Sequence, residues 1–225
     1  MFISEVFTSL QGEGSLVGTP SFFIRTSGCN LRCSWCDTPY TSWKAEGRRY
    51  SVDELVNLAR QSGVAHVVVT GGEPLLQREI GLLTGALREA GLHLTVETAG
   101  TLAPAFDCDL LSLSPKTENS DPAGRWAVRH RRLRSELACA RDLLKRFPEH
   151  QLKFVVRGAE DMSEILRLLS LMPPIDPWRI LLMPEGRSAE EVAEKAGGVA
   201  VLCAKHGFRY TPRLHLDLFG GGRGV

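Results

Sequence analysis

Short apolar segments alternate with amphipathic segments along the chain, and this alternation restricts the possible folds more than any other feature. Residues 66–70 form a β-branched run, which is typical of a strand buried on both faces. Ser51 and Glu54 predict a capping box that opens a helix, and Gly63 ends that helix. Strands and helices in alternation predict right-handed parallel β/α units.

The same periodicities place the other elements. Strands are predicted at residues 2–7, 22–26, 66–70, 93–98, 109–114, 151–156 and 179–183, and a last extended piece at 208–218. Helices are predicted at 52–63, 76–91, 137–147 and 162–171, and from a second capping box at Ser188 and Glu191 towards Gly207. Residues 117–133 are polar and basic, and we expect an excursion over the mouth of a barrel or a surface loop there.

Units of this kind build a full barrel, a partial barrel or an open doubly wound sheet. The predicted helices are fewer and shorter than an eight-unit barrel of roughly 250 residues needs. We therefore expect an α/β fold, a partial (β/α) barrel with a reduced number of helices, formed by one domain over residues 1–225. In each of these folds, ligands lie beyond the C-terminal ends of the strands.

The composition argues against several classes of protein. Of the 225 residues, 43% are hydrophobic and 24% are charged, as in an ordinary globular protein, and the net charge of +1 does not indicate nucleic-acid or membrane binding. The first residues lack the basic and apolar regions of a signal peptide, and no apolar run reaches the roughly 18 residues of a membrane span. We expect a cytoplasmic protein without a nucleic-acid or membrane partner.

Three cysteines with C-x3-C-x2-C spacing follow the strand at 22–26: Cys29, Cys33 and Cys36. A tight loop can converge these thiols on one centre, and thiolates are the usual ligands of iron–sulfur clusters and good ligands of zinc. No fourth Cys or His lies nearby in the sequence, which leaves one metal position open for chemistry. The alternatives are three structural thiols, or a zinc knuckle completed by a distant residue such as Cys108.

Polar residues follow the ends of several predicted strands. Gly71 and Gly72 allow close approach of a ligand to the backbone, and Glu73 or that backbone could bind an ammonium group. Ser114 and Lys116 end a later strand and offer a hydroxyl and a point charge for ribose or a carboxylate. A simple turn at the glycines, and solvated strand ends at Ser114 and Lys116, are the structural alternatives.

A second polar group comes from the two ends of the chain. Arg25 stands within an apolar strand, so it needs a partner; it could form a buried salt bridge, with Glu13 as a candidate, or bind a substrate carboxylate. Gln11 lies in the same early loop as Glu13, and His215 could either cap a core or bind substrate. Asp37 and Thr38 offer oxygens for Mg²⁺ beside the cysteines, although from the residues alone a local turn is the better explanation.

The cysteine spacing, with Trp35 before the last cysteine, resembles the signature of radical S-adenosylmethionine (SAM) enzymes, in which three thiolates hold a 4Fe-4S cluster and SAM chelates the fourth iron. The segments 11–14, 25–31, 33–38, 71–74, 97–98 and 114–116 together resemble the 7-carboxy-7-deazaguanine synthase family. The C-terminal segment 216–219 and the glycine-rich tail depart from the ending found in some members.

The resemblance implies that a 5′-deoxyadenosyl radical takes a hydrogen atom from 6-carboxy-5,6,7,8-tetrahydropterin. The ring then contracts to 7-carboxy-7-deazaguanine, ammonia is lost and SAM is regenerated, on the route to queuosine and other deazapurines. Carried over by position, the implied contacts are Cys29, Cys33 and Cys36 with the cluster, Thr38 with Mg²⁺, Gly72, Glu73 and Ser114 with SAM, and Gln11, Gly12, Glu13, Arg25, Thr70 and His215 with the pterin.

The resemblance also implies a shortened barrel of the radical SAM type, a homodimer, and an electron donor such as flavodoxin or ferredoxin. Two alternatives remain open at this point. A glycyl-radical-enzyme activating enzyme shares the cysteine spacing but has no reason to carry the group Gln11, Glu13 and Arg25. A structural zinc or cluster module would have four satisfied metal ligands and no turnover.

Overall fold

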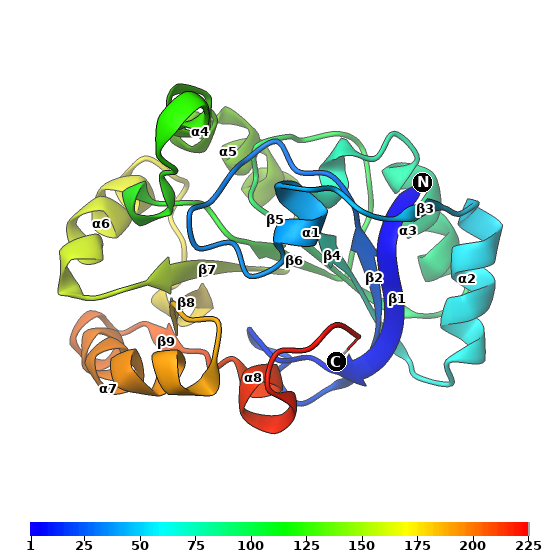
Figure 1. The fold of residues 1–225 in the computed structure, drawn as a ribbon. Coiled ribbons are helices and arrows are strands. Elements are labelled where there is room, and N and C mark those ends of the chain that lie inside the picture. The colour runs from blue at the N-terminus through cyan, green and yellow to red at the C-terminus, as the bar shows by residue number, and fades with distance from the viewer. Residues whose placement is uncertain (225) are drawn as a thin grey trace.

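One curved nine-stranded sheet runs through the protein, seen here in a computed structural model that describes residues 1–224 (Figure 1). The strands are β1 (Phe2–Leu10), β2 (Pro20–Thr26), β3 (Arg48–Arg49), β4 (His66–Gly71), β5 (His93–Thr98), β6 (Leu110–Leu113), β7 (His150–Val156), β8 (Ile180–Pro184) and β9 (Arg209–Tyr210). The helices are α1 (Pro39–Ser42), α2 (Val52–Gln61), α3 (Ile80–Glu89), α4 (Ala127–Ser135), α5 (Ala138–Arg146), α6 (Met162–Ser170), α7 (Ala189–His206) and α8 (Leu214–Phe219).

The sheet order is β3-β1-β2-β4-β5-β6-β7-β8-β9, and every pairing from β2 to β9 is parallel. At the other end, β1 pairs antiparallel with both β2 and β3. Because β3 and β9 are the two edges, the sheet curves without closing, and α2, α3, α5, α6 and α7 lie on its outside (Figure 1). The predicted partial barrel is confirmed.

The two faces of the sheet have different chemistry because side chains alternate along each strand. One face supplies the apolar core under the helices, with Val67, Val69, Leu94 and Val96 fully buried. The opposite, concave face carries polar side chains near the C-terminal strand ends, and these line a cavity. Strand periodicity thus separates residues that stabilise the fold from residues that face a ligand.

Most predicted elements are present, and the capping box of Ser51 and Glu54 has both of its hydrogen bonds. The prediction at 188–191 is half right, since Ser188 caps the backbone of Glu191 but the Glu191 carboxylate binds the backbone N–H of Arg187.

Two of the predictions missed a helix. Residues 117–133 contain two short 3-10 turns and most of α4, because buried His130 and Arg134 anchor an arginine-rich segment that has little apolar periodicity. The extended piece predicted at 208–218 is a two-residue strand followed by α8, in which Leu216 is buried.

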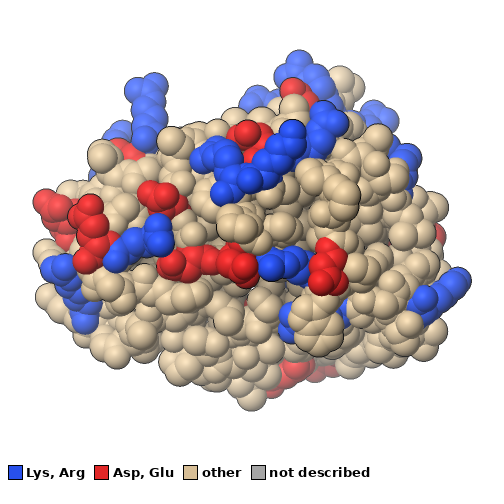
Figure 2. All heavy atoms as spheres, turned by 180° about the vertical axis from the view of Figure 1, so that it is seen from behind, with Lys and Arg blue, Asp and Glu red and all other residues tan. Residues whose placement is uncertain are grey.

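Within the part of the chain that the structure describes, no helix has the length and apolar character needed to cross a membrane. Viewed from behind, acidic and basic side chains share the surface, with basic ones prominent along the upper edge (Figure 2).

Candidate active site

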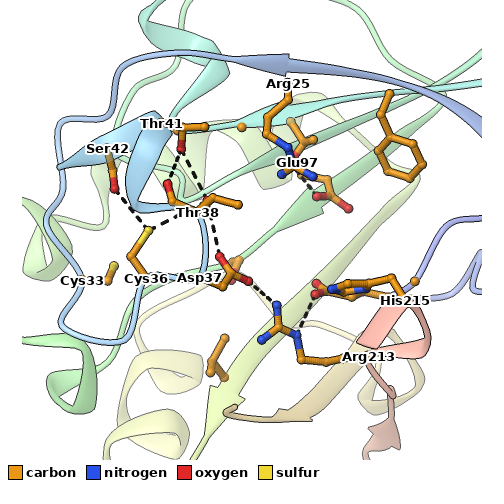
Figure 3. Close-up of a pocket in the computed structure, with 18 of the residues that line it drawn as sticks. Arg25, Cys33, Cys36, Asp37, Thr38, Thr41, Ser42, Glu97, Arg213 and His215 are labelled. Atoms are coloured by element: carbon orange, nitrogen blue, oxygen red, sulfur yellow. Dashed lines mark hydrogen bonds and ion pairs between the residues drawn. The ribbon is translucent and has the colours of Figure 1, made fainter. Parts of the chain in front are cut away.

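A cavity of about 270 Å³ opens on the concave face of the sheet at the C-terminal ends of the strands. The side chains of β2, β4, β5, β6, β7 and β8 that line it are Phe23, Arg25, Thr70, Glu97, Thr98, Ser112, Lys153, Val155 and Met183. The cysteine loop lies at one end of the cavity, and Arg213 and His215 from the C-terminal segment lie at the other (Figure 3).

Cys29, Cys33 and Cys36 all line this cavity, and none forms a disulfide. The loop that carries them is fixed by its neighbours: the Gly28 N–H donates to the Thr41 carbonyl at 2.8 Å, and the Trp43 indole donates to the Cys33 carbonyl at 3.2 Å. The Arg32 guanidinium donates to the carbonyls of Cys29 and Leu31 at 2.7 and 2.6 Å. The backbone between the thiols is therefore held in place by residues of the loop and of α1.

The thiol arrangement fits an iron–sulfur cluster. Among residues 1–224, no three His, Cys, Asp or Glu side chains converge on one ion, as a single zinc would require. In a cluster each thiolate binds a separate iron. Burial raises the pKa of the Cys29 and Cys33 thiols to about 12, so a positively charged metal centre is needed to hold them as thiolates at neutral pH.

The loop after β4 packs directly against the cysteine loop. The Glu73 N–H donates to the Gly28 carbonyl at 2.8 Å, and a Cβ at Gly72 would overlap that same carbonyl. The buried Glu73 carboxylate accepts from the Leu75 and Ala99 N–H groups and the Thr98 hydroxyl at 2.7–3.1 Å, and it does not line the cavity. Burial raises its pKa. Gly72 faces the cavity, whereas Glu73 shapes the loop behind it.

Ser114 and Lys116 line the cavity beside the cysteine loop. The Lys116 ammonium donates to the Ser114 hydroxyl at 2.7 Å and lies 5.7 Å from the centre of the Trp35 ring. A cation and a hydroxyl next to the thiols are suited to a carboxylate or a ribose.

Gln11, Thr70 and Glu97 form a hydrogen-bonded group on the cavity wall. The Gln11 amide and the Thr70 hydroxyl donate to separate oxygens of Glu97 at 3.1 and 2.8 Å, and the Gln11 amide oxygen accepts from the Glu13 N–H at 3.2 Å. Gln11 and Thr70, which lie 86 and 27 positions before Glu97 in the sequence, thus hold its carboxylate in place.

Arg25 forms a salt bridge, as one of its two interpretations held, but the partner is not the candidate Glu13. Arg25 Nε donates to Glu5 at 2.6 Å, across the β1–β2 pair in which these residues face each other, and the Tyr40 hydroxyl donates to the same Glu5 oxygen at 2.8 Å. The two terminal nitrogens of Arg25 make no hydrogen bond to any residue of 1–224, and the side chain lines the cavity. Arg25 is thus available for an anion.

Glu13 instead lies between two cations. Its carboxylate pairs with Lys153 and with Arg213 Nε, the latter at 3.1 Å. Arg213 also donates to the Gly186 carbonyl and to Asp37, and Figure 3 shows the pair with Asp37. Burial alone would raise the pKa of Glu13, but Lys153 and Arg213 hold it well below its ordinary value. Burial opposes the charge on Arg213, yet Asp37 and Glu13 raise its pKa. We call Glu13, Asp37, Lys153 and Arg213 the ion network.

His215 stands beside Gly12 at the cavity wall, and a Cβ at residue 12 would overlap the His215 ring. Burial lowers the pKa of His215, which favours the neutral ring. Thr38 also faces the cavity, and its hydroxyl lies 3.4 Å from Asp37 and 3.9 Å from the Cys36 sulfur.

Sequence reasoning missed Lys153 and Arg213. Lys153 occupies the concave-face position of β7 between Leu152 and Phe154, both of which point into the core. Strand periodicity gave a signal for this residue, since a lysine at an inward position of an apolar strand needs an acidic partner. For Arg213 the local sequence gave no signal, because α8 was not predicted.

A family model described as the radical SAM superfamily matches residues 23–172. The 7-carboxy-7-deazaguanine synthase of Rhodopirellula baltica is 44% identical over 229 residues, covering 100% of this chain and 89% of that protein. The protein of the same name from Halobacterium salinarum is also 44% identical, covering 96% of this chain and 90% of that protein. The chain belongs to the 7-carboxy-7-deazaguanine synthase family.

The solved structures agree with this family. QueE from Escherichia coli superimposes with a TM-score of 0.71 at 26% identity, over 95% of this chain and 94% of that one. Streptococcus suis SuiB, bound to a precursor peptide, has a TM-score of 0.56 at 14% identity and covers 84% of this chain, which shows a shared fold alone. Because the chain belongs to the radical SAM superfamily, its cofactors are a 4Fe-4S cluster and SAM.

Proposed function

We propose that this chain converts 6-carboxy-5,6,7,8-tetrahydropterin to 7-carboxy-7-deazaguanine with loss of ammonia, as a lyase of deazapurine biosynthesis. The observation that carries the proposal is the cavity itself, in which three thiols at one end face a set of anion- and amide-binding groups at the other. Two relatives that are 44% identical over nearly the whole chain bear the name of this activity. A glycyl-radical-enzyme activating enzyme is not favoured, because it acts on a protein backbone and does not need these groups.

The residues divide the cavity between the cofactors and the substrate. Cys29, Cys33 and Cys36 would hold the cluster, which together with SAM supplies, when bound, the radical that starts the reaction. Ser114 and Lys116 would bind polar groups of SAM, and Gly72 would admit SAM close to the backbone in a loop that Glu73 braces.

The opposite end of the cavity would bind the pterin. Arg25 has two free terminal nitrogens and is suited to bidentate binding of a carboxylate. Gln11, Thr70 and Glu13 offer amide, hydroxyl and carboxylate groups for the hydrogen-bonding edge of a bicyclic substrate, with Gly12 leaving room for the neutral His215. The conversion proposed needs no net oxidant, because ring contraction and loss of ammonia balance the atoms of the substrate.

Thr38 would contact Mg²⁺, which prefers oxygen ligands and retains several waters. Its hydroxyl lies next to the Asp37 carboxylate on the cavity wall. We also propose an electron donor such as flavodoxin or ferredoxin, a homodimer, a cytoplasmic location, and one domain over residues 1–225.

An anaerobic assay tests the proposal. The reconstituted protein receives SAM, dithionite and the pterin, and product is followed by mass and absorbance, with Cys33→Ala as the inactive variant and Cys108→Ala, outside the loop, as the matched control. We expect product from the wild type and from Cys108→Ala alone. Cleavage of SAM without conversion of the pterin would point to a different substrate, and a colourless protein without SAM cleavage would leave only the metal-module alternative.

A further inference from the structure

Residues 117–135, which include α4 and most of which were predicted to form an excursion or a surface loop, pack against the cysteine loop. The Ser34 N–H donates to the Ser120 carbonyl at 2.9 Å, and the Arg32 N–H donates to His130 Nδ1 on α4 at 3.0 Å. The Trp35 indole donates to Asn119 at 3.0 Å. The α4 segment is thus a direct neighbour of the backbone that carries Cys33 and Cys36, and the active-site chemistry described above does not use it.

This part of the chain is strongly basic. Residues 118–146 contain eight Lys or Arg and four Asp or Glu, whereas the whole chain has a net charge of only +1. Arg125, Arg129 and Arg132 are exposed and form no ion pair with any residue of 1–224. We call these three residues the α4 patch. Basic side chains are prominent along this upper edge of the molecule in the view from behind (Figure 2).

The scaffold under the α4 patch is rigid. Arg134 is buried and pairs with Asp121 at 2.6 Å and with Glu164 at 2.8 Å. The buried His130 ring also accepts or donates a hydrogen bond at 2.9 Å with the Ser120 hydroxyl. The Trp126 ring contacts two guanidinium groups, that of Arg32 in the cysteine loop at 4.9 Å and that of Arg125 in the patch at 5.1 Å. The patch is therefore fixed in position relative to the loop.

An exposed apolar side chain lies within the α4 patch. Val128 is 75% exposed and directly precedes Arg129 in α4; Arg125 lies three positions before Val128 and Arg132 four positions after it. An apolar centre with a charged surround is typical of a protein–protein interface. A nucleic-acid backbone would need the arginines but not the exposed valine, so the patch favours an acidic protein.

We propose that the α4 patch is the docking surface for an acidic one-electron carrier protein, which transfers one electron to the cluster through the cysteine loop and is itself oxidised by one electron. The inference rests on the proposed function, in which an oxidised cluster must gain one electron before the enzyme can begin turnover. The substrate and SAM fill the cavity, whereas Ser34 of the loop is exposed on the side of α4. Complementary charge would steer the carrier to that side.

The test compares two triple variants. Arg125→Gln/Arg129→Gln/Arg132→Gln removes the patch, and Arg49→Gln/Arg60→Gln/Lys205→Gln removes three exposed, unpaired cations elsewhere. The probe is a purified acidic flavodoxin, with a ferredoxin as the second carrier. Binding of the oxidised carrier to the reconstituted protein is measured calorimetrically at low and high salt, and turnover is measured with the reduced carrier and, separately, with dithionite.

We expect the patch variant to bind the carrier about tenfold more weakly at low salt, with a flatter salt dependence. Its carrier-driven turnover should fall in proportion at limiting carrier, while dithionite-driven turnover stays at the wild-type level, and the control should match the wild type throughout. Dithionite turnover tests the proposed function separately from docking.

Equal loss in both triple variants, or unchanged carrier binding in the patch variant, would overturn the inference. Loss of dithionite turnover in the patch variant would also overturn it, unless the single variant Arg129→Gln weakens carrier binding while retaining that turnover. The inference also fails if the wild type binds neither carrier, or if a DNA duplex binds to the patch and the carriers do not.

Discussion

The two ends of the cavity are built on opposite principles. At the C-terminal end, the charged side chains of the ion network are paired with one another and held ionised, as the lowered pKa of Glu13 and the raised pKa of Lys153 show. At the cysteine end, the loop is fixed by hydrogen bonds to its backbone, from the Arg32 guanidinium and the Trp43 indole among others, and burial favours neutral Cys29 and Cys33 thiols. One end is complete in the protein alone, whereas the other is completed by a metal centre.

This difference has a physical consequence. A buried charge is stable only with a partner, so the C-terminal end must carry its own counter-charges in the protein alone. The Cys29 and Cys33 thiols at the cysteine end become charged only when a metal binds, so metal binding contributes to the stability of that end. Changes in the ion network should therefore alter the stability of the metal-free protein more than changes at the cysteine end.

Replacing Arg213 should have the largest effect. In Arg213→Gln, Glu13 and Asp37 each lose a cationic partner, and we expect the free energy of unfolding to fall by about 3–5 kcal/mol. Urea denaturation followed by circular dichroism measures this. Arg167→Gln breaks an exposed pair with Glu164 at 3.4 Å and is the control, with an expected loss below about 0.5 kcal/mol. Similar small losses in both variants would remove the distinction between the two ends.

The pH dependence of stability should depend on Glu13. A carboxylate with a lowered pKa stabilises the fold above its ordinary pKa, here 4.5, and this contribution is lost as the pH falls towards its folded pKa. The free energy of unfolding of the wild type should therefore decrease as the pH is lowered below about 5. Between pH 7 and the acid limit of folding, the free energy of unfolding of Glu13→Gln should decrease by roughly 2–3 kcal/mol less than that of the wild type. Unfolding curves at several pH values test this, with the exposed Glu89→Gln as control. Parallel curves for wild type and Glu13→Gln would contradict the prediction.

Replacing Glu73, whose loop packs against the cysteine loop, tests the cysteine end of the cavity. In Glu73→Gln, the amide nitrogen would face N–H donors now bound by the carboxylate, with an expected loss of about 1–3 kcal/mol in the free energy of unfolding. Because the Glu73 loop packs on Gly28, SAM binding should weaken as well. Calorimetry of SAM binding to the reconstituted protein checks this against Glu194→Gln, an exposed site. Unchanged stability and SAM affinity would show that the bracing by Glu73 is dispensable.

Arg223 in the C-terminal tail should have the smallest effect. It lies over the Tyr40 ring at 3.8 Å and pairs with the exposed Glu46 at 3.0 Å, at the rim of the cavity. Arg223→Ala should change stability by less than about 1 kcal/mol and raise the KM for the pterin without altering kcat. Steady-state kinetics with dithionite measures both constants, and Arg209→Ala is the control. A fall in kcat would show that the C-terminal tail affects the reaction itself, and not only substrate binding at the rim of the cavity.

The sequence by itself determined the parallel β/α organisation, the cysteine loop and the polar strand ends. These features are encoded within a few residues, by period-2 and helical patterns and by short motifs such as Gly71-Gly72-Glu73-Pro74. Strand register then carried the candidate residues Arg25 and Thr70 to one cavity, since adjacent parallel strands end at the same edge.

Only the tertiary structure decided how the charges pair. Lys153 and Arg213 reach Glu13 across 140 and 200 residues of sequence, and Arg25 binds Glu5 of the neighbouring antiparallel strand. The α4 helix likewise depends on buried His130 and Arg134 finding partners outside the helix. Local periodicity reports which face of an element is apolar, whereas the identity of an ionic partner depends on sheet order and curvature, which bring distant segments together.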